Sequence, residues 1–266
     1  MIRHAPWQAP PYDFAIGLRT IPEEAWLEGG AAEAGRKTAL LNTEPDCVWG
    51  EIPCSQAGQS EVLSLVEAAT GRKGDPSLRP LWAAGLLCAD DLCLMEKTDG
   101  AWRLTAASLC SPTFFTVAEA LGKSLDDLHG PVPAFAQRFL PRVARMFDAL
   151  SPGPVLERSN WTVTASGEAY LPASAPVRAS LQDVPLDQAG ERLFLRVERQ
   201  TLRKLPQTGA VLFTIRAWRN PLNALKDDPV RLAAFAAAWR GASDDFRAYK
   251  GLASYDVLVE AFLARQ

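Results

Sequence analysis

The chain has 266 residues, of which 48% are hydrophobic and 22% are charged, and its formal net charge at pH 7 is −3. This composition supports a buried core for one large domain or two small ones. The small net charge and the dispersed basic residues exclude a nucleic-acid-binding protein, and no run approaches the ~18 consecutive apolar residues of a membrane span. The N-terminus lacks the apolar region of a signal peptide, so we expect a cytoplasmic protein.

The first half of the chain predicts an extended arm, one helix and several short strands. Residues 1–22 contain four prolines and predict a loosely held N-terminal arm. Apolar residues recur with helical spacing over 60–69, with Ser60 as the N-cap. The Asp-Gly pair at 99–100 predicts a tight turn between two strands. The segments that read as strands are 86–88, 92–95 and 102–107.

The second half alternates between predicted helices and strands. Residues 116–129 predict two helical pieces that break near Gly122 and stop at Gly130-Pro131. A helix over 134–150 is expected to kink at Pro141. The other predicted elements are a strand at 160–164, a long hairpin at 192–218 and helices at 230–240 and 246–265.

Strands that are joined by hairpins and surrounded by helices are typical of the α+β class. We expect an antiparallel sheet that flanking helices cover on one face. The predicted organisation is an extended arm over 1–22 and a single domain over 23–266 that ends in C-terminal helices.

The long hairpin carries the most informative pattern in the chain. If residues 206–209 form its loop, Leu205 lies opposite Ala210, and counting back places Arg199 directly across from Arg216. Like charges in that position destabilise a sheet, so the pair requires a counter-ion. An acidic side chain such as Asp183 or Glu191 would satisfy it, and so would a bound anion. Side-chain alternation places these residues on one face: Leu193, Leu195, Val197, Arg199, Thr201, Arg203, Leu212, Thr214 and Arg216.

Histidine is scarce, because the chain has two, His4 and His129. This excludes a three-histidine zinc site, and a two-histidine iron site would have to use His4 from the N-terminal arm. His129 ends a predicted helix, where an imidazole interacts favourably with the helix dipole. The alternative is a metal or haem ligand at a rigid helix end, since haem iron needs one protein nitrogen.

The remaining motifs favour no other chemistry. The five cysteines lack C-x-x-C spacing, which disfavours a disulfide framework and a zinc site. Asp90 and Asp91 are adjacent and diverge, so we expect a solvated turn instead of shared acid–base chemistry. Ser108 and Ser111 have no neighbouring histidine, and the chain has no glycine-rich phosphate loop.

Five segments, taken in order, carry a resemblance to a known family. They are Leu-His-Gly-Pro-Val-Pro at 128–133, Arg-Ser-Asn-Trp at 158–161, Arg-Val-Glu-Arg-Gln-Thr-Leu-Arg-Lys-Leu-Pro at 196–206, Phe-Thr-Ile-Arg at 213–216 and Tyr-Lys-Gly at 249–251. With these segments the chain resembles the haem-dependent oxidative N-demethylase family from Trp26 to Tyr255. At 110–113 it reads Cys-Ser-Pro-Thr where the family tends to show Cys-Phe-Pro-Ser, which indicates a different pocket wall.

The resemblance implies a PAS-like fold that binds haem b in the catalytic subunit of an amine-oxidising complex. The haem iron would activate O2, and a small secondary amine such as dimethylamine would lose a methyl group as formaldehyde. Electrons would come from NADPH through flavin and iron–sulfur partners, and a folate-binding partner would capture the one-carbon product.

Carried onto this sequence, the family implies His129 as the axial ligand of the iron. Arg199, Arg216 and Thr201 are the residues implied to be catalytic. The implied contacts to the propionates and the distal side come from Arg199, Arg203 and Arg216, with Asn160 and Thr201 as hydrogen-bonding neighbours. Two other functions stay open: a PAS-like haem sensor of gas or redox state, and a non-catalytic subunit that binds an anion.

Overall fold

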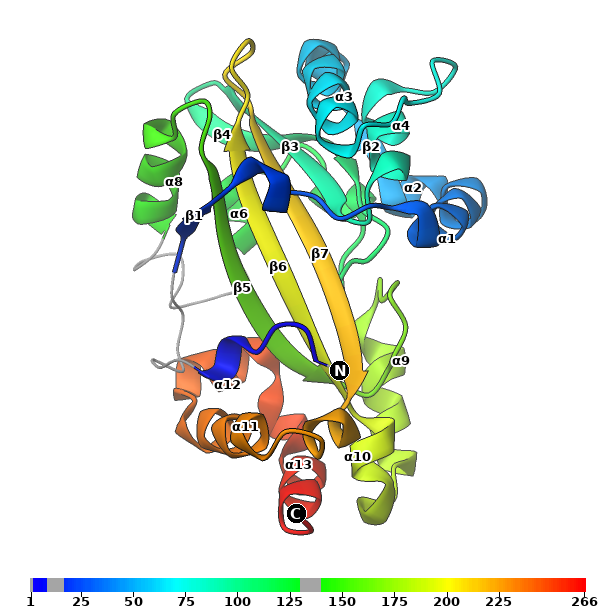
Figure 1. Cartoon of the computed structure of the whole chain (residues 1–266), viewed down its shortest axis with the longest axis vertical. Helices are drawn as coiled ribbons and strands as arrows, with labels where there is room; N and C mark the ends of the chain where they lie inside the picture. Colours follow the sequence, from blue (N-terminus) through cyan, green and yellow to red (C-terminus); the bar gives the residue numbers. More distant parts are fainter. Residues whose placement is uncertain (1, 9–16, 130–139) are drawn as a thin grey trace. The chain divides into compact units, whose positions relative to one another are not determined.

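The computed structural model describes residues 2–8, 17–129 and 140–266, and it contains an open seven-stranded antiparallel sheet with flanking helices (Figure 1). This confirms the predicted α+β class. The order across the sheet is β1-β5-β6-β7-β3-β4-β2. The strands are β1 (Arg19–Ile21), β2 (Trp49–Glu51), β3 (Asp91–Thr98), β4 (Ala101–Ser108), β5 (Val155–Thr164), β6 (Phe194–Lys204) and β7 (Val211–Pro221).

The helices fall before, between and after the strands in the sequence. Those before β3 are α1 (Ala31–Thr43), α2 (Pro45–Val48), α3 (Gln56–Thr70) and α4 (Pro80–Leu87). Between β4 and β6 lie α5 (Val117–Ala120), α6 (Leu125–His129), α8 (Leu140–Ala149), α9 (Ser174–Ala179) and α10 (Ala189–Arg192). The C-terminal helices are α11 (Pro229–Gly241), α12 (Asp244–Lys250) and α13 (Asp256–Leu263).

The chain divides into two compact units, and both are discontinuous in sequence. The first unit comprises Met1–Gly17, Ser159–Arg199 and Ala217–Gln266. The second unit comprises Leu18–Arg158 and Gln200–Arg216. The three longest strands, β5, β6 and β7, each contribute residues to both units. The domain boundaries expected from the sequence, 1–22 and 23–266, stay a prediction.

In the second unit, helices cover both faces of the sheet. Leu92 and Leu94 of β3 pack with α3 and α4, whereas Cys93 and Met95 pack with α5, α6 and α8. We call these sides the α3 face and the α6 face. The helices α1 to α4 form one group in Figure 1, drawn in blue and cyan. The expectation of a sheet covered on one face is therefore wrong here, because successive residues of β3 are apolar and buried on opposite sides.

In the first unit, the C-terminal helices share one aromatic core. In Figure 1, α11, α12 and α13 lie together, drawn in orange and red. Trp161 of β5 packs against Phe235 of α11 and Phe246 of α12. Trp7 is fully buried, with its ring centroid 6.1 Å from that of Trp161 and 6.0 Å from that of Phe235. Within residues 2–8, Trp7 is therefore anchored by its buried aromatic ring, and this part of the predicted arm is not loosely held.

Several local predictions are confirmed by the backbone. The turn between β3 and β4 has Asp99 at φ 51° and Gly100 at φ 78°, as a two-residue hairpin requires. The helical region after Thr116 breaks at Gly122, whose φ is 79°. The hairpin strands β6 and β7 extend over most of the predicted 192–218 range.

Other local predictions are wrong for identifiable reasons. Helix α3 begins at Gln56, so Ser60 lies inside it and donates its hydroxyl to the Gln56 carbonyl at 3.0 Å. Leu86 and Leu87 end the helix that Pro80 starts, and Cys88 forms an isolated β-bridge with Gly29. A short apolar run does not distinguish a buried helix from a strand. Gly251, with φ 63°, interrupts the predicted helix at 246–265. Pro141 lies in the first turn of α8, and the predicted stop at Gly130-Pro131 and residues 134–139 lie outside the described residues.

We expect Trp7→Ala to lower the free energy of unfolding by about 3–5 kcal/mol, because it empties a fully buried aromatic site. The Trp7→Ala variant also loses the hydrogen bond that Trp7 Nε1 donates to the Arg231 carbonyl at 3.2 Å. Trp7→Phe keeps most of the ring and should cost clearly less. Urea denaturation measures both variants, and a wild-type midpoint for Trp7→Ala would contradict the anchoring role.

Candidate functional site

The predicted hairpin register holds in the second unit. Leu205 donates its backbone N–H to the Ala210 carbonyl at 2.8 Å, and the hydroxyls of Thr201 and Thr214 are 2.6 Å apart. Thr201 also accepts a hydrogen bond from the Trp26 indole at 3.1 Å. All three side chains of this network are fully buried. The Thr201 hydroxyl is thus engaged on the α3 face, to which Trp26 belongs.

The arginines on this face have carboxylates as counter-ions. Arg203 donates from Nη2 to Glu23 at 2.7 Å. Arg216 contacts Glu28 at 3.2 Å and Glu33 at 3.4 Å. Residues 23–33, which we call the acidic strap, thus supply three acids to two strand arginines. The counter-ions that the hairpin pattern required include acidic side chains of the chain itself.

Arg203 is 7% exposed, and its guanidinium lies 4.3 Å from the centre of the Trp26 ring. Its Nε and Nη1 are buried without a hydrogen-bond partner in the described part of the chain. Trp26 and Glu23 therefore occupy the space around this guanidinium, and two of its donor atoms are left over. The α3 face at this point is filled by protein side chains.

Helix α6 packs on the other side of the sheet. Its Leu125 and Leu128 join the same apolar cluster as Leu202 and Val211, which alternate with Thr201 and Leu212 of the α3 face. His129 is the last residue of α6, and its side chain lies outside the described part. The structure therefore does not bring α6 together with Thr201, Arg203 and Arg216.

On the α6 face, Phe213 and Ile215 of β7 are half-buried, although β7 has a neighbouring strand on each side. We call these two residues the half-buried strip. Leu156 packs in the same cluster as these two residues, so alternation directs Arg158 to this face as well. Arg158 is half-buried and was not singled out from the sequence, although it begins the Arg-Ser-Asn-Trp segment. That segment was the signal for it.

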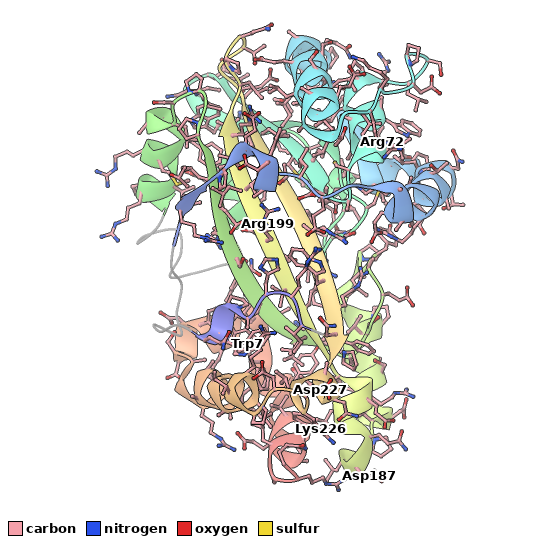
Figure 2. All side chains as sticks on the ribbon, in the orientation of Figure 1. Trp7, Arg72, Asp187, Arg199, Lys226 and Asp227 are labelled. Atoms are coloured by element: carbon pink, nitrogen blue, oxygen red, sulfur yellow. The ribbon has the colours of Figure 1, made fainter. Side chains whose placement is uncertain are left out.

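Two predicted site residues, Asn160 and Arg199, belong to the first unit. Asn160 donates from Nδ2 to Glu198 at 3.5 Å, and Glu198 also contacts Arg196 at 3.3 Å. Arg199 is 5% exposed and lies in the middle of β6, where Figure 2 labels it. The roles of these residues at a cofactor stay predictions.

The acidic pair at 90–91 is buried, which overturns the predicted solvated turn. The Asp91 carboxylate is fully buried and accepts the backbone N–H groups of Cys110 at 2.9 Å and Ser111 at 2.7 Å. The fully buried Lys37 ammonium lies 3.8 Å from it and donates to the carbonyls of Gly85, Cys88 and Asp90. Burial raises the pKa of Asp91, and Lys37 together with the two N–H donors opposes the rise.

The other polar groups of the described residues give little support for a metal centre or a reactive thiol. No group of three or more His, Cys, Asp or Glu side chains in 2–8, 17–128 and 141–266 could hold a metal ion. Burial raises the pKa of the Cys88 and Cys110 thiols to about 12, so both stay protonated at neutral pH. None of the helices in the described part combines the length and the hydropathy that a bilayer crossing needs.

We expect Asp91→Asn to lower the free energy of unfolding by about 2–4 kcal/mol, because it places an amide N–H against a backbone N–H donor and leaves Lys37 without its counter-charge. Lys37→Met should also lower the free energy of unfolding, because the carbonyls of Gly85, Cys88 and Asp90 lose their donor, but the double variant should lose less than the sum of the two single variants. Chemical denaturation of the two single variants and the double variant forms a cycle. Strict additivity of the two losses would contradict the coupling.

One comparison with known proteins bears on the site. A family model described as "Haem-dependent oxidative N-demethylase, alpha subunit-like" matches residues 58–259, which is well over half of the chain. The matched region contains α6, the half-buried strip and the whole β6–β7 hairpin. It begins after the acidic strap.

Proposed function

This chain belongs to the haem-dependent oxidative N-demethylase, alpha subunit-like, family, and from that premise we propose that it removes a methyl group from a small secondary amine. Dimethylamine is the simplest such substrate, and formaldehyde would be the carbon product. The family name indicates an oxidoreductase that depends on haem. Monooxygenase chemistry, haem b and a PAS-like fold complete the proposal. The match over residues 58–259 is the observation that carries it.

The residues of the α6 face suit a haem. A porphyrin needs a flat apolar surface, one axial nitrogen and cations for its propionates. Phe213 and Ile215 offer half-buried apolar surface in the cluster that includes α6, whose last residue is His129. Arg158 adds a guanidinium to that face. The α3 face suits a haem less well, because Trp26 and the acidic strap cover its arginines.

We therefore assign His129 as the residue that would hold the iron and Arg158 as a candidate for the propionates. When bound, the haem supplies the O2 chemistry, and the protein supplies orientation and polarity. The apolar side chains of Phe213 and Ile215 would exclude water from the amine. Arg203, Arg216 and Thr201 would act from the α3 face by fixing β6 and β7 against the acidic strap. The roles expected for Arg199 and Asn160, which belong to the first unit, stay predictions.

An alpha-subunit-like family implies other subunits. We propose that electrons reach the haem from NADPH through a flavin and iron–sulfur partner. A folate-binding partner would take up the one-carbon product. The complex would operate in the cytoplasm, with O2 and the amine as diffusible substrates.

The proposed function predicts that haem-reconstituted protein shows a Soret band and, with O2 and an electron donor, releases formaldehyde from dimethylamine. His129→Ala should lose the Soret position of the wild type and at least 100-fold in formaldehyde release, because it removes the axial nitrogen. Absorption spectroscopy and a formaldehyde assay measure both. Identical spectra for wild type and His129→Ala would refute the assignment of the ligand.

The two faces make different predictions for the arginines. Arg158→Ala should weaken haem binding about ten- to a hundredfold, since a charge-assisted hydrogen bond is worth about 1.5–3 kcal/mol. Arg216→Ala should instead lower the free energy of unfolding by about 1–3 kcal/mol, because Glu28 and Glu33 lose their shared cation. Haem titration and denaturation of both variants separate the cases. A large loss of haem affinity in Arg216→Ala with little loss in Arg158→Ala would return the cofactor to the α3 face.

A further inference from the structure

The loop between β4 and α5 is fixed firmly at its first residues. The Asp91 carboxylate accepts the N–H groups of Cys110 and Ser111. Arg36 donates to the Cys110 carbonyl at 2.7 Å and to the Ser111 hydroxyl at 3.0 Å. Donors and acceptors from two other elements therefore determine where this loop begins.

The last residue of the loop is fixed as well. Thr116 forms a capping box with Glu119: the Thr116 hydroxyl accepts the Glu119 N–H at 3.3 Å, and the Glu119 carboxylate accepts the Thr116 N–H at 2.8 Å. Residues 112–115 must span the distance between these two fixed points.

Phe114 within this span has φ +64°, which lies in the left-handed region. A bulky side chain pays roughly 1–2 kcal/mol there, and a glycine would adopt the same backbone without that cost. A strained aromatic residue that is kept between two fixed ends indicates that its side chain is used. Phe114 and the following Phe115 are both half-buried.

The loop borders the half-buried strip of the α6 face. Phe115 packs against the same cluster as Leu128, Phe213 and Ile215. Asp91 is the direct partner of Ile215 across the β3–β7 pairing. The anchor of the loop, Phe115 and the half-buried strip are therefore neighbours in the second unit, and Phe114 directly precedes Phe115.

We infer that Phe114 and Phe115 wall the amine site and set the size of the nitrogen substituents it accepts, and that Asp91 is the positioning residue for this wall. The inference rests on the proposed function. A wall of two adjacent aromatic rings favours small secondary amines, because added methylenes would meet the rings. A pocket of this kind discriminates by about 10- to 200-fold per methylene at most.

The test compares Phe114→Ala with Phe114→Gly. Both remove the ring, and the glycine variant also removes the left-handed strain. We expect both to raise the ratio of kcat/KM for N-methylbutylamine to that for dimethylamine at least tenfold. The amine-induced shift of the Soret band gives the same ratio for binding alone.

The outcomes separate the wall from the function. A wild-type enzyme that demethylates dimethylamine, together with unchanged ratios in both variants, overturns the wall and leaves the function standing. A change in the glycine variant alone assigns the effect to the backbone and overturns the wall too. A wild type that yields no formaldehyde from either amine overturns the proposed function and this inference with it.

Asp91→Asn tests the positioning role without haem. Amide hydrogen exchange over 110–116 should quicken at least tenfold in the haem-free variant, and the amine ratio should move as in Phe114→Ala. Asp75→Asn is the matched control, because Asp75 is an exposed aspartate that caps a local turn at Ser77. Arg36→Ala, which removes the donor to the Cys110 carbonyl and the Ser111 hydroxyl, replaces the Asp91 variant if that one does not fold. Uniformly faster exchange across the whole second unit, or an unmoved amine ratio, refutes the positioning role.

Discussion

The arrangement of the second unit depends on how a buried cation on β6 and a half-buried cation on β7 are neutralised. Arg203 and Arg216 project from adjacent strands, and charges taken out of water must be paired. Glu23, Glu28 and Glu33 provide that pairing from one continuous strap, and Trp26 adds a hydrogen bond to Thr201. The strap residues are far from the hairpin in sequence. Their contacts make one face of the sheet a closed protein interface.

Because side chains alternate along a strand, the residues that contact the acidic strap determine which residues point to the α6 face. Each residue of β6 and β7 that contacts the strap has neighbours that point toward α6. On that side of the strands Leu202 and Val211 are buried, and Phe213 and Ile215 are half-buried. A cofactor with a large apolar surface suits this face better than the face with the arginines. In the proposed function the arginines would act on the cofactor through the strands they share with it, without direct contact.

A second buried ionic arrangement acts in the same unit at the start of β3. Lys37 and Asp91 are both withdrawn from water, and each is satisfied mainly by backbone groups. These two side chains are therefore poor candidates for an acid or base that exchanges protons with the solvent. The effect of Asp91 is geometric, since it fixes the backbone of a loop whose Phe115 packs beside the half-buried strip. The departure of this chain from the family pattern falls in that same loop, at 110–113.

The sequence by itself determined the α+β class, the β6–β7 register and the need for counter-ions, because alternation and turn chemistry act over a few residues. Through motif resemblance it also determined the family. Tertiary structure decided that Glu23, Glu28 and Glu33 are counter-ions, that Asp91 is buried, and that α6 lies across the sheet from Thr201, Arg203 and Arg216. None of these follows from local pattern, because each depends on which distant segment packs on which face, and a single strand gives both faces the same alternation.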